Sequence, residues 1–245
     1  MPRYPHFRVV IDGSSLTAPE SEHYEYDVNG VVMTMKLSLV GDALLNSLTR
    51  DVWIVPHYES GQNAAAVPID RLASEVAGQQ SHSCLTGQPK ADASGKPVIG
   101  TGSGSESRIH FTPGEFLSNS TAGGQSSKIE IAMRRDEVLF HEMVHSLRQT
   151  FGVMDCTAHA DGYDTRDEVW AVMTTNVYCS AFRRPLRKNH QGFDLLTDSE
   201  AKGFYKKYES MIERMCRELP YFTRTVGQID YIRFNPFREY YRSHA

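Results

Sequence analysis

The stretch that decides the fold is Leu139-Phe140-His141-Glu142-Met143-Val144-His145. At about 100° per residue, its apolar side chains and those that follow fall in one broad arc of a helix. These side chains are Leu139, Phe140, Met143, Val144, Leu147 and Phe151. His141 and His145 fall nearly opposite that arc, so packing the apolar face leaves the histidines on the other one. The pattern predicts an amphipathic helix that ends at Gly152, a typical helix stop residue.

Two histidines one helical turn apart can bind the same metal ion. Zinc accepts neutral histidine nitrogens at about 2.0–2.1 Å and prefers tetrahedral geometry. Glu142 follows the first histidine by about 100° around the helix, so its carboxylate can reach a water molecule on the metal without binding the metal itself. The sequence therefore predicts one Zn²⁺ ion held by His141 and His145, with Glu142 as the base that activates the water.

A catalytic zinc normally has a third protein ligand. One subclass of zinc peptidases places a glycine and then a histidine or aspartate after the second histidine, and Arg148 and Phe151 at those positions exclude it. Another subclass takes a glutamate from a second helix roughly twenty residues downstream. Glu168 fits that place at the start of an apolar helix, although the helix dipole alone would also favour a carboxylate there. The remaining candidates are His159, Asp161 and Asp164.

The rest of the chain predicts an α+β fold, with strands gathered early and helices late around a small mixed or antiparallel sheet. We expect strands at 7–11, 24–28, 31–37, 52–55 and 108–111, where Asn29-Gly30 suits the type I′ turn of a hairpin. We expect helices at 42–48, at 69–76 and from a capping box at Thr197 to about 219. Polar loops are expected at 78–104 and 118–127. One domain at 1–245 is predicted, strand-rich to about 115 and helical from about 130.

Composition and charge exclude several classes of protein. A net charge of −4 on 245 residues argues against a general nucleic-acid binder, which normally carries a basic excess. No apolar run has the length of a membrane span. The N-terminus lacks the charged start and apolar stretch of an export signal. We therefore expect a protein that stays in the cytoplasm or is secreted by a route that reads no such signal.

Four features, taken in order, resemble the bacterial effector metallopeptidases. They are Gly102-Ser103-Gly104-Ser105 before Ile109-His110-Phe111-Thr112-Pro113, the stretch from Leu139 to His145, Asp167-Glu168 leading to Thr175-Asn176-Val177-Tyr178, and Pro185-Leu186-Arg187 with His190-Gln191-Gly192-Phe193. They cover roughly residues 97–194. The likeness is to the NleD-type zinc endopeptidases of type III secretion and to related toxin domains on type VI secretion spike proteins.

This resemblance implies a zincin-like fold of the gluzincin kind, with Glu168 as the third zinc ligand. It also implies cleavage of a protein or peptide substrate in a target cell, delivery by a secretion machine, and a secretion chaperone, spike protein or immunity protein as partner. Val172 stands four residues after Glu168. The second-helix carboxylate of thermolysin-like enzymes is therefore absent, and the partner that orients a zinc histidine is not identified.

Peptide hydrolysis also requires a donor for the oxyanion that develops on the substrate carbonyl. Tyr178 and His190 are the candidates for this catalytic role, although Tyr178 also suits a core position and His190 a surface position. Two other functions remain open. One is a zinc-dependent amidase that acts on cell wall or small peptides, and the other is a non-catalytic binding module with a vestigial motif.

Overall fold

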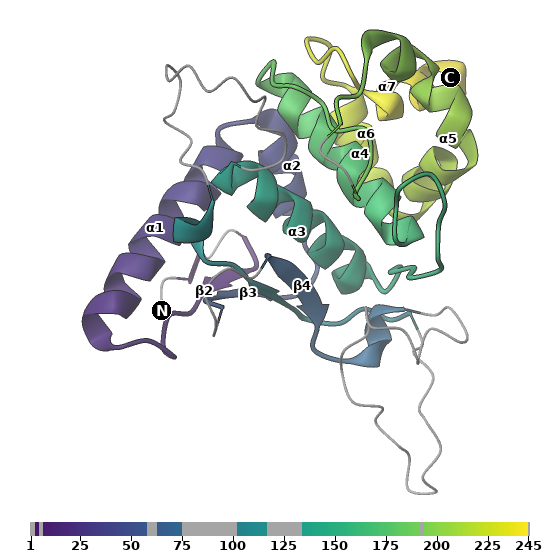
Figure 1. Ribbon diagram of the computed structural model, residues 1–245. Helices are drawn as coiled ribbons and strands as arrows, with labels where there is room; N and C mark the ends of the chain where they lie inside the picture. Colours follow the sequence, from purple (N-terminus) through teal and green to yellow (C-terminus); the bar gives the residue numbers. More distant parts are fainter. Residues whose placement is uncertain are drawn as a thin grey trace, which may run out of the picture.

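The computed structural model describes residues 3–4, 7–57, 63–74, 102–116, 134–191 and 194–244. The loop predicted at 118–127 lies outside these residues, as does all but the end of the loop predicted at 78–104. In Figure 1 a small sheet lies beneath two of the longer helices, and the C-terminal helices gather beside them. The mixed α and β composition is as predicted.

The sheet has five strands in the order β1-β2-β3-β5-β4. The strands are β1 (Arg3–Tyr4), β2 (Val9–Ile11), β3 (Val52–Val55), β4 (Ala65–Pro68) and β5 (Ser107–His110). Strands β2, β3 and β5 run parallel, whereas β1 and β4 are antiparallel at the two edges. The strands predicted at 7–11, 52–55 and 108–111 are therefore confirmed, and β1 and β4 are additions. The sheet is mixed, as expected.

The hairpin predicted at 24–37 is wrong, because these residues lie in helix α1 (Ala18–Lys36) or directly after it. The buried side chains of α1 recur at helical spacing and are Tyr24, Val28, Val31, Val32 and Met35. At the start of the helix, the backbone N–H and the hydroxyl of Thr17 donate to Glu20 Oε2 at 3.2 and 2.6 Å. Gly30 costs the helix about 1 kcal/mol in propensity. Burial of the apolar stripe outweighs this cost and the local turn signal.

Helix α2 (Leu39–Ser47) confirms the helix predicted at 42–48. Helices α1 and α2 together occupy most of the chain before β3. The prediction that the chain is strand-rich to about 115 is therefore wrong for this part. The helix predicted at 69–76 is, within the described residues, a single 3-10 turn, η1 (Arg71–Ala73). Among the described residues no helix is by itself long and apolar enough to cross a bilayer, and α1 and α2, bent by 111°, pass that test only as a pair.

Helix α3 (Arg135–Phe151) forms as predicted and packs on the sheet with its apolar arc. Its last turn is joined to the strands by polar side chains: Ser107 Oγ bonds to Ser146 Oγ at 2.8 Å and donates to Gln149 Oε1 at 2.6 Å. The helix stops at Gly152, whose φ is 77°. A Cβ atom there would lie 2.0 Å from the carbonyl oxygen of Gly102, so only glycine fits this stop.

The chain after α3 is helical, as expected, in all its longer described elements. These are α4 (Arg166–Ala181), α5 (Asp198–Glu218), α6 (Pro220–Gly227) and α7 (Pro236–Ser243). The capping box at Thr197 begins α5 as predicted. One cluster of buried apolar residues includes side chains from β2, α1 and α3 to α7. Helix α4 packs along α3, and this contact places the second half of the site beside the two histidines (Figure 1). The extent of the domain over 1–245 stays a prediction.

Candidate metal centre

Helices α3 and α4 bring the three predicted ligands to one point. His141 and His145 come from α3, and Glu168 comes from the first turn of α4. The two histidine Nε2 atoms are 3.2 Å apart. Glu168 Oε2 lies 3.1 Å from Nε2 of His141, and Glu168 Oε1 lies 3.4 Å from Nε2 of His145. One ligand atom from each residue lies within 4.8 Å of the others, as a shared ion requires.

These separations fit a tetrahedral zinc site. Zinc bonds of about 2.0–2.2 Å at tetrahedral angles place neighbouring ligand atoms about 3.3–3.6 Å apart. The two histidine nitrogens are 3.2 Å apart, and each lies 3.1 or 3.4 Å from a different oxygen of the Glu168 carboxylate, which is close to this spacing. Two imidazole nitrogens and one carboxylate are also a common donor set for catalytic zinc. The residues therefore fit a metal ion of this kind in both spacing and chemistry.

The other candidates for the third ligand lie elsewhere. The ring of His159 packs beside the rings of Tyr163 and Tyr208, at 6.0 and 6.4 Å between centroids. Asp161 forms an ion pair with Lys207 at 3.1 Å. Within the described part of the chain, the group of His141, His145 and Glu168 is the one that could hold a metal ion. The geometry thus favours Glu168 over His159, Asp161 and Asp164.

The cluster is electrostatically suited to a positive charge. Burial alone would raise the pKa of Glu168, but His145 and His141 beside it hold that pKa well below its usual range. Burial would lower the pKa of His145, yet the carboxylates of Glu168 and Asp167 raise it well above its usual value. A cation bound between these side chains would be stabilised by the same carboxylates that raise the pKa of His145.

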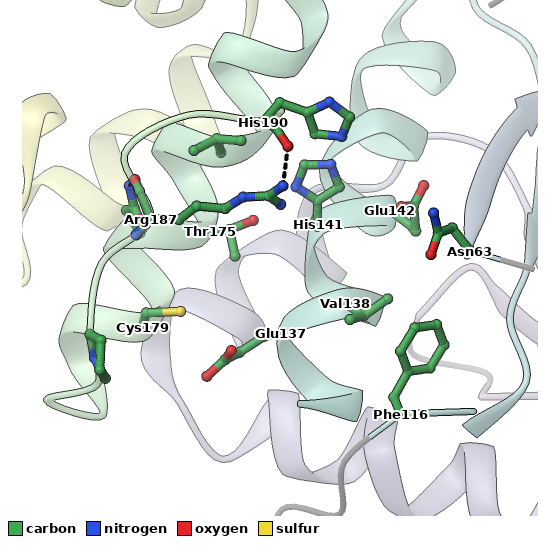
Figure 2. Close-up of a pocket in the computed structure, with 13 residues that line it drawn as sticks. Asn63, Phe116, Glu137, Val138, His141, Glu142, Thr175, Cys179, Arg187 and His190 are labelled. Carbon is green, nitrogen blue, oxygen red and sulfur yellow. Dashed lines mark hydrogen bonds between the residues drawn. The ribbon is translucent and has the colours of Figure 1, made fainter. Parts of the chain in front are cut away.

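Glu142 lies one position after His141 on α3 and is 8% exposed. Its Oε2 accepts the backbone N–H of Ala66, on the edge strand β4, at 2.8 Å. Ala66 is also held at its carbonyl, which accepts from Gln149 Nε2 at 3.1 Å. The edge strand therefore fixes the orientation of the Glu142 carboxylate, and Figure 2 shows this carboxylate on the β4 side of His141.

A cavity of about 190 Å³ opens beside His141 and Glu142. Its walls come from the turn of α3 before His141, the next three turns of α4 after Glu168, the segment that follows α4, and Asn63 and Phe116. The lining side chains include Val138, Val172, Thr175, Cys179, Pro185 and Arg187. The Thr175 hydroxyl is buried and has no hydrogen-bond partner. The cavity therefore offers room for a side chain next to the cluster, in mixed surroundings where apolar groups stand beside the charged side chains of Glu137 and Arg187 (Figure 2).

The structure brings His190 to the cluster. Its Nδ1 bonds to Asp164 Oδ2 at 2.6 Å, and its Nε2 lies 3.4 Å from Glu168 Oε2. The ring stacks on that of His141 with centroids 5.8 Å apart. Arg187 donates to the backbone carbonyl of His190, as the dashed line in Figure 2 shows. Burial lowers the pKa of His190, although the neighbouring Glu168 opposes that shift.

Tyr178, by contrast, is not brought to the cluster. It is fully buried, and its hydroxyl donates to Asp136 Oδ2 at 2.8 Å. Its ring stacks on Phe140 with centroids 4.3 Å apart. The geometry does not support the catalytic role predicted for Tyr178, because the apolar packing of α4 on α3 turns its side chain into the core.

The sequence did not identify the residue that orients a histidine of the cluster. In the structure this residue is Asp167, whose Oδ2 lies 2.8 Å from Nδ1 of His145. The sequence signal that could have identified Asp167 is its position directly before Glu168. Neighbouring residues in the first turn of a helix point about 100° apart. One can therefore face the metal while the other faces the back of a ligand.

The site defines a class of protein in which a histidine pair on one helix and a carboxylate from the next helix form a group that could hold one metal ion. The chain matches the model of the Peptidase_M91 family, described as effector protein, over residues 12–183. It belongs to this family, and the matched range includes all three candidate ligands and Glu142. The resemblance to effector peptidases is thereby confirmed at the level of the family. No curated protein and no solved structure showed a significant match.

Proposed function

We propose that this protein is a zinc metalloendopeptidase of zincin-like fold, delivered as an effector, that hydrolyses peptide bonds in a protein of a target cell. The observation that carries the proposal is the convergence of His141, His145 and Glu168, whose ligand atoms, one from each residue, lie within 4.8 Å of one another, with Glu142 on the same helix as the histidines. Family membership supports the peptidase activity and the effector role. The NleD-type likeness, the type VI toxin likeness and the partners that they imply belong to this proposal as well.

Bound zinc would lower the pKa of a coordinated water towards neutrality and polarise the substrate carbonyl. Glu142 accepts the proton of the attacking water and passes it to the leaving amine. The backbone N–H of Ala66 occupies Oε2 of Glu142 and thereby holds the carboxylate in one orientation. The cavity beside His141 takes the substrate side chain next to the bond that is cut.

His190 is the donor that we assign to the developing oxyanion. Nδ1–H of His190 donates its hydrogen bond to the Asp164 carboxylate, so donation from Nε2 as well requires the imidazolium form. Burial lowers the pKa of His190 in spite of the carboxylates of Glu168 and Asp164, so the donor role requires that the developing oxyanion itself stabilise the imidazolium form. Asn176 holds the segment before His190 in place, because its side chain makes both hydrogen bonds to the backbone of Arg187, at 2.7 and 2.8 Å.

The test of the proposal is metal content together with a panel of substrates. Elemental analysis of the purified protein should find one zinc ion per chain. A chelator should abolish cleavage of protein substrates, and added zinc should restore it. Cleavage of cell-wall fragments in place of proteins would indicate the amidase, and absence of stoichiometric metal would indicate a non-catalytic module.

Replacing His190 with alanine should lower kcat by about 10²–10³-fold, the usual cost of losing one oxyanion donor. Zinc content should not change, because His190 is outside the ligand set. Gln191→Ala is the matched control, since Gln191 also donates to Asp164, at 2.8 Å, without facing the cluster. Its activity should stay close to that of the natural protein. Loss of zinc from the His190 variant would make this residue a metal ligand instead.

A further inference from the structure

A buried polar network lies behind the metal cluster, on the side of His145 that faces away from the other ligands. Asp167 Oδ2 bonds to Nδ1 of His145 at 2.8 Å. Asp167 Oδ1 accepts from Arg148 Nε at 2.7 Å and from the backbone N–H of Asp155 at 3.1 Å. Asp167 is 2% exposed and Arg148 is 0% exposed. Both oxygens of this carboxylate are thus engaged, one towards the cluster and one away from it.

Arg148 is itself fixed on every side. Its guanidinium lies 3.8 Å from the centroid of the Trp170 ring. Its Nη1 donates to Glu218 Oε2 at 3.1 Å, and its Nη2 donates to the carbonyl of Val153 at 2.5 Å. A buried guanidinium is costly unless its donors are satisfied. Arg148 therefore cannot turn away from Asp167 without losing several bonds at once.

This arrangement determines which nitrogen of His145 carries the hydrogen. A carboxylate has acceptors and no donor, so Nδ1 must carry the hydrogen of the bond to Asp167. In the neutral ring, Nε2 then presents its lone pair, and Nε2 is the atom that lies 3.2 Å from His141 Nε2. A metal ion requires that form of the ring.

We propose that Asp167, held by Arg148, is a positioning residue that fixes the Nδ1–H form of His145 and thereby sets the affinity of the site for metal. The inference rests on the proposed function in one respect, since it requires a metal ion at the cluster. It does not depend on the reaction or on the substrate. It is also independent of the residue that donates to the oxyanion.

Asp167→Asn is the sharpest test, because asparagine keeps the shape of aspartate but has a single oxygen. Arg148 Nε and the Asp155 N–H both donate to Oδ1 of Asp167, so these two donors keep the single amide oxygen on their side. The amide NH₂ then faces Nδ1 of His145, which must accept, so the hydrogen moves to Nε2 and blocks the metal. Zinc affinity, measured by competition with a chromogenic chelator, should fall about 10–100-fold. The rise in Tm on adding zinc should shrink accordingly.

Asp161→Asn is the matched control, because it makes the same chemical change on the segment before α4, and Asp161 pairs with Lys207 instead of a ligand. Its zinc affinity should equal that of the natural protein. Equal affinity in a folded Asp167→Asn variant would overturn the inference while leaving the proposed function intact. Failure of the natural protein itself to bind metal would overturn both.

A second measurement covers the case in which Asp167→Asn does not fold. In the zinc-loaded natural protein, NMR should show the Nδ1 proton of His145 strongly downfield and protected from exchange, as a bond to a buried carboxylate requires. A proton in rapid exchange with water would contradict the role assigned to Asp167.

Discussion

Replacing Glu142 with glutamine is expected to abolish measurable peptide cleavage while leaving zinc bound. The amide cannot accept the proton of the attacking water, and loss of a general base costs about 10²–10⁴-fold in kcat. The fold should persist, because the amide oxygen can still accept the N–H of Ala66, which Glu142 Oε2 accepts at 2.8 Å. Cleavage rate and zinc content per chain, measured on the same preparation, check this prediction.

Glu213→Gln provides the control for the Glu142 variant. Glu213 lies on α5 and pairs with Arg217 at 3.6 Å on the surface, so the same chemical change there should leave the rate unaltered. Unchanged cleavage by Glu142→Gln would remove the proposed mechanism. Loss of zinc together with activity would show that Glu142 supports the metal site and is not confined to proton transfer.

Replacing His141 or Glu168 is expected to remove the metal. His141→Ala deletes one of three ligands, and Glu168→Gln replaces an anionic ligand with a neutral, weaker one. We expect zinc affinity to fall by more than the roughly 100-fold that a residue outside the ligand set can cause. Peptidase activity should fall with it. Elemental analysis after dialysis, followed by titration with zinc, gives both quantities.

His159→Ala is the control for these ligand variants, because His159 lies on the chain between the histidine pair and Glu168 but packs beside Tyr163. It should keep its zinc. Retention of zinc by Glu168→Gln together with loss by His159→Ala would place the third ligand in the segment before α4 and correct the site. Retention of zinc by His141→Ala would contradict the metal centre as a whole.

Local sequence was sufficient for helix α3 because several signals there agree. Apolar spacing, the histidine pair and the stop at Gly152 all indicate the same helix, which the structure has from Arg135 to Phe151. The strands at 52–55 and 108–111 and the capping box at Thr197 followed for the same reason. Where local preference and the pattern of burial agree, an element can be predicted from its own residues, without knowledge of its tertiary contacts.

The hairpin prediction at 24–37 failed because local preference and burial disagree there. Asn29-Gly30 between β-branched and aromatic residues favours a hairpin locally. The same residues also place a buried stripe at helical spacing, from Tyr24 to Met35. Only packing against the rest of the core decides between the two patterns. Local propensities differ by about 1 kcal/mol or less per residue, whereas each buried large side chain contributes about 1.5–3 kcal/mol.

The sequence by itself determined the chemistry of the site: two histidines on one helical face, an acid between them, and a short set of candidates for the third ligand. Tertiary structure alone decided which candidate joins them, because the packing of α4 on α3 places Glu168 at the histidines and Asp167 behind His145. The same packing turns Tyr178 into the core, while the segment after α4 carries His190 to the cluster. The spacing of residues along one helix is a local property of the sequence. The contact between separate helices depends on how their apolar faces pack together, which the sequence pattern of either helix does not specify.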